Sequence, residues 1–230
     1  MRSILRTDPV ARDVTALCLA GVVVGLSFGA IASAAGVPLG KIVVMNAFVY
    51  AGGAQFLAVG LAGAGASAVA IIVAGLLLNA RHLPFGLAIG NEVLGDGRPA
   101  RLVGSHLMTD ESVAFALAQQ EPGRRRRAYW LTGVCLFLTW NVSAGVGAIA
   151  GSALGDPNTF GIDAAFPAAL LALTLPSLKD RPSMRVAIAG AALALVATPF
   201  LPAGLPVLVA LLALAFALPV KRRSPVRRRS

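Results

Sequence analysis

The chain has 230 residues, of which 57% are hydrophobic and only 13% are charged, and its mean hydropathy is +0.79. These values exclude an ordinary soluble globular domain and predict an integral membrane protein. The net charge of +10 does not indicate nucleic-acid binding, because the basic residues cluster just outside the apolar segments, as topology anchors do.

Seven apolar segments follow one another along the chain, several of them near the roughly 20 residues that a membrane span needs. They are residues 14–35, 42–62, 66–80, 128–154, 161–177, 184–200 and 205–220. The sequence therefore predicts one all-α domain over residues 1–230, a polytopic transmembrane helix bundle of seven spans.

Residues 102–119 are less apolar and contain His106, Asp110 and Glu111. Ionised groups are costly within the bilayer, so we expect a short polar helix that dips into the membrane or lies at its interface. A full crossing here would make an eighth span.

Three basic clusters set the expected orientation of the second half. They lie at residues 124–127, 179–185 and in the tail, 221–230. Placed on the cytoplasmic side, they put the C-terminus in the cytoplasm. The side of the N-terminus stays open, because seven and eight spans give the same excess of cytoplasmic basic residues.

A shift of 118 residues aligns three blocks without a gap: 29–32 on 147–150, 47–48 on 165–166, and 83–87 on 201–205. This pattern predicts a duplicated three-helix unit, with halves at about 14–90 and 128–208 and a linking segment at 91–127. Seven spans would make the halves inverted, and eight would make them parallel. Secondary transporters use both arrangements and bind substrate between the halves.

Small residues recur every fourth position in the first apolar segment and in the fourth. They are Gly21, Gly25, Gly29 and Ser33 in one, and Ser143, Gly147, Gly151 and Gly155 in the other. This spacing favours close helix packing. The alternative is a helix that slides or exposes its backbone to a substrate.

Gly52 and Gly53 interrupt the second segment just before Gln55. Glycine weakens a helix, and a broken helix within a membrane must line a cavity or be covered by protein. Either Gln55 bonds to a neighbouring helix, or its amide and the freed backbone groups hold a substrate.

The third segment ends in Asn79, Arg81 and His82, and Pro84 opposes a continuing regular helix. Arg81 either extends to the membrane interface or recognises an anion. His82 is a candidate proton carrier, since its ordinary pKa lies near about 6.5.

Asp110 and Glu111 form an adjacent acidic pair, preceded by Thr109 as a possible helix cap. Beside a membrane cavity such a pair would couple transport to protons; otherwise it is a solvated surface pair. We expect no metal, because no third histidine or cysteine stands nearby, and no cofactor.

The segment Gly25-Leu-Ser-Phe-Gly29 matches the Gly-x-Ser-x-Gly pattern of serine hydrolases. That pattern works at a strand-to-helix turn, whereas Ser27 is expected in the middle of a helix. An intramembrane serine protease is therefore disfavoured, and we expect no enzyme.

Five motifs in order resemble the AzlC family, the large subunit of bacterial branched-chain amino acid exporters. They are GLSFGA at 25–30, FVYAGGAQF at 48–56, LNARHL at 78–83, TDES at 109–112, and GID at 161–163 before Phe166. Two positions depart from the expected pattern: Asn46, where a small residue is expected, and Pro84, where a bulky one is.

The resemblance implies a permease of the bacterial inner membrane that exports leucine, isoleucine, valine and sometimes methionine, driven by the proton gradient. It also implies a small membrane partner subunit of the AzlD type.

From the residues, we expect Gln55, Asn79 and Arg81 to hold the charged ends of the amino acid, with Phe48 and Phe56 in its apolar pocket. His82, Asp110 and Glu111 are the expected proton-coupling groups. The alternative is a membrane scaffold subunit with no transport path of its own.

Overall fold

The computed structural model describes residues 8–95, 97–153, 171, 175, 178–202 and 205–217. All regular elements in these ranges are helical, which confirms the all-α prediction. In chain order they are α2 (Pro9–Ala34), α3 (Leu39–Phe48), α4 (Gly52–Gly63), α5 (Ala68–Asn79), α6 (His82–Leu94), α7 (Arg98–His106), α8 (Asp110–Leu117), α9 (Pro122–Ala153), α11 (Arg181–Ala197), α12 (Leu205–Ala210) and the 3-10 helix η3 (Leu211–Ala217). Gly155, Asp163, most of the predicted span 161–177 and the basic tail lie outside the described residues.

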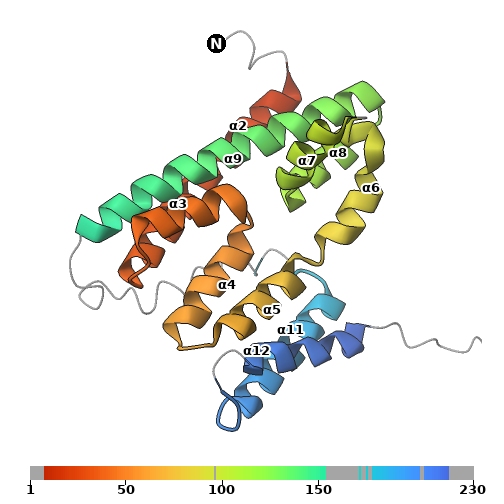
Figure 1. Ribbon diagram of the computed structural model, residues 1–230. Coiled ribbons are helices and arrows are strands. Elements are labelled where there is room, and N and C mark those ends of the chain that lie inside the picture. Colours follow the sequence, from red (N-terminus) through yellow and green to blue (C-terminus); the bar gives the residue numbers. More distant parts are fainter. Residues whose placement is uncertain are drawn as a thin grey trace, which may run out of the picture.

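Two long helices, α2 and α9, dominate the described structure (Figure 1). Asp8 caps α2 by accepting a hydrogen bond from the Val10 N–H, and Pro9 occupies the first turn, where its missing N–H costs nothing. Within the described ranges, α2 and α9 are the two single helices long and apolar enough to cross a membrane. A third crossing is present if α5 and α6, bent by 47°, count as one span. The seven-span count is therefore not confirmed.

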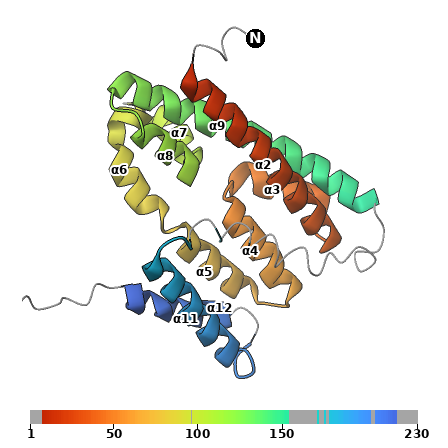
Figure 2. The same cartoon turned by 180° about the vertical axis from the view of Figure 1, so that it is seen from behind.

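Helices α2 and α9 run parallel and side by side, as Figures 1 and 2 both show. Their small residues face each other: a Cβ on Gly29 would overlap the Ala144 carbonyl oxygen, and one on Gly147 would overlap the Leu26 carbonyl oxygen. The Cβ that Gly151 lacks would lie 2.8 Å from Ala30 Cα. The two backbones thus approach more closely than larger side chains allow. The predicted duplication is not confirmed, because much of its second half lies outside the described residues.

Helices α3 and α4 close the core: α3 packs against α9 and α2, and α4 contacts α2. Phe28 of α2 packs edge-on against Phe56 of α4, with ring centroids 5.1 Å apart, and stacks on Trp140 of α9 at 5.5 Å. Phe28 and Phe56 are fully buried. This aromatic cluster fixes α4 relative to the long helix pair.

Three breaks separate neighbouring helices, two of them in apolar segments and one in the polar segment 102–119. The predicted span 42–62 is two helices, separated at 49–51, which confirms the break expected beside Gly52 and Gly53. Helix α5 gives way to α6 at Ala80–Arg81, and Pro84 falls in the first turn of α6, where a proline is tolerated. The polar segment likewise forms two short helices, α7 and α8, separated at 107–109.

Helix α11 begins at the Asp180 cap, whose carboxylate accepts hydrogen bonds from the N–H and the hydroxyl of Ser183. These two bonds, the backbone one foremost, lower the pKa of Asp180. Helices α11 and α12 pack against each other beside α5 (Figure 2).

Candidate functional site

The three helix breaks converge on one cavity of about 350 Å³. This volume lies in the range typical of small-molecule sites. The first residues of α4, α6 and α8 contribute to its wall, and α2 and α9 complete it. Its lining comprises Leu17, Ala20, Gly21, Val24, Tyr50, Ala51, Gly52, Gly53, Arg81, His82, Thr109, Asp110, Glu111, Leu136 and Trp140.

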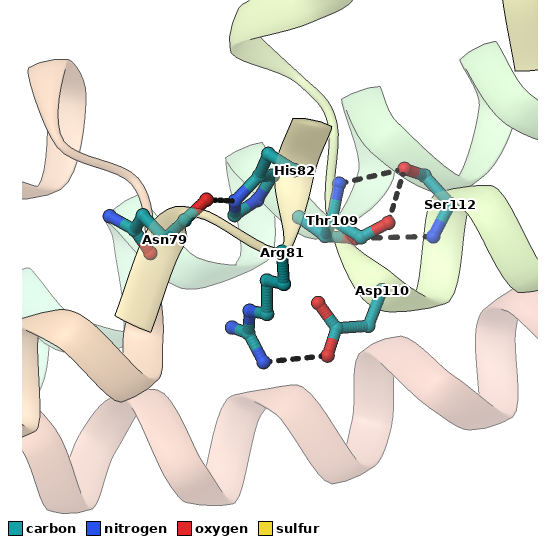
Figure 3. A network of polar contacts seen from close by, with 6 residues as sticks. All are labelled: Asn79, Arg81, His82, Thr109, Asp110 and Ser112. Carbon is teal, nitrogen blue, oxygen red and sulfur yellow. Dashed lines mark hydrogen bonds and ion pairs between the residues drawn. The ribbon is translucent and has the colours of Figure 1, made fainter. Parts of the chain in front are cut away.

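Arg81 and Asp110 form an ion pair at this cavity, with 2.7 Å between Arg81 Nη1 and Asp110 Oδ2 (Figure 3). Their side chains are 37% and 46% exposed, so both charges remain partly accessible. Arg81 Nε is buried and has no hydrogen-bond partner. The pair is therefore a charged site with spare donor capacity on the arginine.

A reciprocal capping box fixes the start of α8. The Ser112 N–H donates to Thr109 Oγ1 at 3.1 Å, and the Thr109 N–H donates to Ser112 Oγ at 2.9 Å (Figure 3). The predicted cap at Thr109 is thus confirmed. Because the box satisfies two backbone donors, Asp110 and Glu111 are held at the cavity without having to cap the helix themselves.

His82 lies on the cavity wall beside Arg81, and its Nδ1 lies 2.9 Å from the Asn79 carbonyl oxygen (Figure 3). Asn79 itself is not part of the lining, and its side-chain oxygen is buried without a hydrogen-bond partner. Of the residues expected to act on substrate or protons, the structure brings four together at the cavity: Arg81, His82, Asp110 and Glu111.

Gln55 lies one layer behind the cavity wall and is fully buried. Its Nε2 donates to Asn46 Oδ1 at 2.7 Å, and its Oε1 accepts from Trp140 Nε1 at 3.0 Å. The amide of Gln55 thus joins α3, α4 and α9. Asn46, which departs from the expected family pattern, is its partner.

The two phenylalanines expected in the pocket lie elsewhere. Phe48 is 78% exposed at the end of α3, and Phe56 belongs to the buried aromatic cluster. His106 Nε2 lies 2.8 Å from the Ala47 carbonyl oxygen, which accepts its hydrogen bond, and His106 is not in the lining. The apolar part of the lining comes instead from Leu17, Val24, Leu136 and Trp140.

Sequence reasoning did not assign Tyr50 or Trp140 to the substrate pocket, although both line the cavity. Tyr50 immediately precedes Ala51 and Gly52 at the helix break. Because a broken helix in a membrane lines a cavity or is covered by protein, this position could have identified Tyr50 as a cavity residue. Trp140 offered a weaker signal, because it lies on a different helix from the glycines it covers; a Cβ on Gly52 would lie 3.0 Å from the Trp140 ring.

A second cavity of about 760 Å³ lies between the start of α2, the start of α9 and the end of α8. Asp8, Arg124 and Arg127 line it, and Asp8 forms an ion pair with Arg127. Helix α8 thus contributes its first residues to one cavity and its last turn to the other. Within the described residues, no group of three metal-ligating side chains is present.

Comparison with known proteins gives one positive result. The family model described as AzlC protein matches residues 16–154, which include every residue of the cavity. No curated protein and no solved structure matches the chain.

Proposed function

Because the chain belongs to the AzlC family of membrane proteins, we propose that it is a secondary transporter that exports leucine, isoleucine, valine and methionine across the bacterial inner membrane. The observation that carries this proposal is the Arg81–Asp110 ion pair, held at a cavity where three helices are broken. Ionisable groups inside apolar bundles are expensive and usually mark a substrate or ion path.

An aliphatic amino acid at neutral pH carries one carboxylate, one ammonium and an apolar side chain. The cavity offers a partner of matching chemistry to each: Arg81 for the carboxylate, and Asp110 and Glu111 for the ammonium. Leu17, Val24 and Leu136 are suited to the side chain. In this scheme the substrate inserts between Arg81 and Asp110 and replaces their mutual contact.

Proton coupling follows from the same groups. A proton on Asp110 or Glu111 would weaken the hold on the ammonium, and His82, which lines the same cavity, would supply or receive that proton. Alternating binding of substrate and proton at shared carboxylates would couple export to the proton gradient.

We further propose that the chain works with a small membrane subunit of the AzlD type and that its C-terminus faces the cytoplasm. Large apolar side chains on the outer faces of α2 and α5, including Leu19, Val23, Val69 and Leu76, are exposed and suit lipid or a membrane partner.

Leucine export from loaded cells tests the proposal. Cells expressing the chain with a small membrane subunit of the AzlD type should release leucine faster than cells without it, and Arg81→Ala should reduce that release at least tenfold while membrane expression persists. Arg12→Ala is the matched control, because Arg12 is 71% exposed and pairs with its neighbour Asp13. Normal export by Arg81→Ala would show that Arg81 is not part of the site. If cells expressing the wild-type chain release leucine no faster than cells without it, the proposed function is refuted.

A further inference from the structure

Tyr50 is a buried residue in an unfavourable backbone conformation. Its φ is +39°, in the left-handed region that residues other than glycine rarely adopt, so the backbone is strained there. The residue is only 6% exposed, and its hydroxyl has no hydrogen-bond partner among the residues that the structure describes. A strained tyrosine with an unpaired buried hydroxyl requires a reason, because buried polar groups are normally satisfied.

The Tyr50 ring is held in place by packing. It meets Phe137 of α9 edge-on, with centroids 5.0 Å apart and planes at 77°. Tyr50 also belongs to the cavity lining. The ring is therefore fixed at the cavity wall, and its hydroxyl is an unpaired donor.

The start of α4 follows Tyr50 in the chain and lines the same cavity. No side chain caps α4, and the helix begins with Gly52 and Gly53, both in the cavity lining. The free N–H groups and the dipole of a helix N-terminus attract negative charge. Without Cβ atoms, these two glycines let a ligand approach the backbone.

Arg81 completes the surroundings. A Cβ added to Gly53 would lie 4.0 Å from Arg81 Nη2, so the guanidinium and the start of α4 are neighbours. Arg81 uses Nη1 for Asp110, while its Nε is unpartnered. One anion could therefore contact the arginine and the helix start together.

We propose that the Tyr50 hydroxyl, the N-terminus of α4 at Gly52–Gly53 and Arg81 form a subsite for a carboxylate, the α-carboxylate of the transported amino acid. This inference deepens the proposed function by assigning the substrate's orientation. The carboxylate lies toward α4, and the ammonium lies toward Asp110 and Glu111 at the start of α8.

Binding to the full-length chain in lipid nanodiscs tests the subsite with three probes: L-leucine, L-leucinamide, which lacks the carboxylate, and 4-methylpentanoate, which lacks the ammonium. Tyr50→Phe keeps the ring and removes only the hydroxyl. A hydrogen bond to a charged group is worth enough to make leucine and 4-methylpentanoate bind roughly tenfold to a hundredfold more weakly. Leucinamide binding should change little.

Tyr129→Phe is the matched control, because these are the chain's two tyrosines and the Tyr129 hydroxyl donates to the Gly104 carbonyl oxygen at 2.7 Å, away from the cavity. It should leave all three affinities unchanged. Equal losses for all probes in Tyr50→Phe, or no loss, would overturn the subsite.

The probes also separate the subsite from the proposed function. If the wild-type chain binds 4-methylpentanoate in a Tyr50-dependent manner but does not export leucine, the subsite stands and the exporter assignment fails. If the wild-type chain exports leucine and the Tyr50→Phe variant has the same relative affinities for the three probes as the wild type, the exporter assignment stands and the subsite fails. A wild-type chain that binds neither carboxylate contradicts both.

Discussion

Arg81 and Asp110, 29 residues apart in the chain, meet at the cavity through one 2.7 Å contact between Nη1 and Oδ2. The first follows the break between α5 and α6, and the second begins α8. Partly exposed ion pairs are worth only about 0–1 kcal/mol, so a substrate can separate this pair at little cost. In the proposed transport scheme, the pair would link occupancy of the cavity to the position of α8.

Neutralising the acidic pair should separate binding from coupling. In Asp110→Asn/Glu111→Gln, the Thr109–Ser112 capping box remains, so α8 should still form. We expect leucine export to lose its dependence on an imposed pH gradient and to fall at least tenfold in vesicle efflux assays.

Glu121→Gln is the control for this double variant, because Glu121 is 67% exposed and pairs with Arg124 outside the cavity. It should export leucine like the wild type. If the double variant exports leucine at the wild-type rate and still responds to the pH gradient, a scaffold role for the chain is favoured instead.

Two glycines only two positions apart on α9 should respond very differently to alanine. A Cβ on Gly147 would overlap the Leu26 carbonyl oxygen of α2, whereas one on Gly145 meets nothing within 4 Å. Overpacking of this kind typically costs about 1–3 kcal/mol. Gly147→Ala should therefore lower the thermal unfolding midpoint in detergent, and Gly145→Ala should leave it unchanged or raise it.

Equal midpoints for the two variants would contradict the close contact between α2 and α9. A Gly147→Ala variant that unfolds normally but does not export would indicate that the helices must slide past each other during transport.

The amide network behind the cavity should behave as one unit. Gln55→Leu leaves Asn46 and Trp140 without their partner, and an unsatisfied buried polar group costs about 1–3 kcal/mol. Asn46→Leu should be destabilising for the same reason. The double variant should lose less stability than the sum of the single losses, as thermal unfolding of all four proteins would show.

Strict additivity of these losses would contradict the bond between Gln55 and Asn46. A Gln55→Leu variant of unchanged stability but altered amino acid preference would place the Gln55 side chain at the substrate, as the sequence suggested.

The sequence predicted the charged part of the cavity better than its apolar part. Ionisable residues in apolar surroundings stand out in any sequence, so Arg81, His82, Asp110 and Glu111 could be selected without knowing the fold. Phe48 and Phe56 could not be placed, because a phenylalanine looks the same in a sequence whether it faces lipid, core or cavity. Which surroundings each of these two side chains faces depends on the helix break at 49–51, which lies between them.

The helix breaks show a similar division. Glycine and proline indicated breaks near Gly52 and Pro84, and the Thr109 cap indicated the start of α8. That the three breaks meet at one cavity depends on tertiary packing, which hydropathy and spacing do not encode. Helix length was equally hard to predict, since an apolar run of residues fits one span or two half-helices.

Protection of a cavity residue by substrate tests the central claim most directly. In a chain whose Cys18 and Cys135 are replaced by alanine, Ala20→Cys places a thiol on the α2 wall of the cavity, and Ala118→Cys places one in the second cavity. The rate of modification by a charged thiol reagent is measured with and without leucine. The account predicts that leucine slows modification of Ala20→Cys several-fold, that lysine does not, and that Ala118→Cys reacts at the same rate throughout. A rate at Ala20→Cys that leucine leaves unchanged would contradict it.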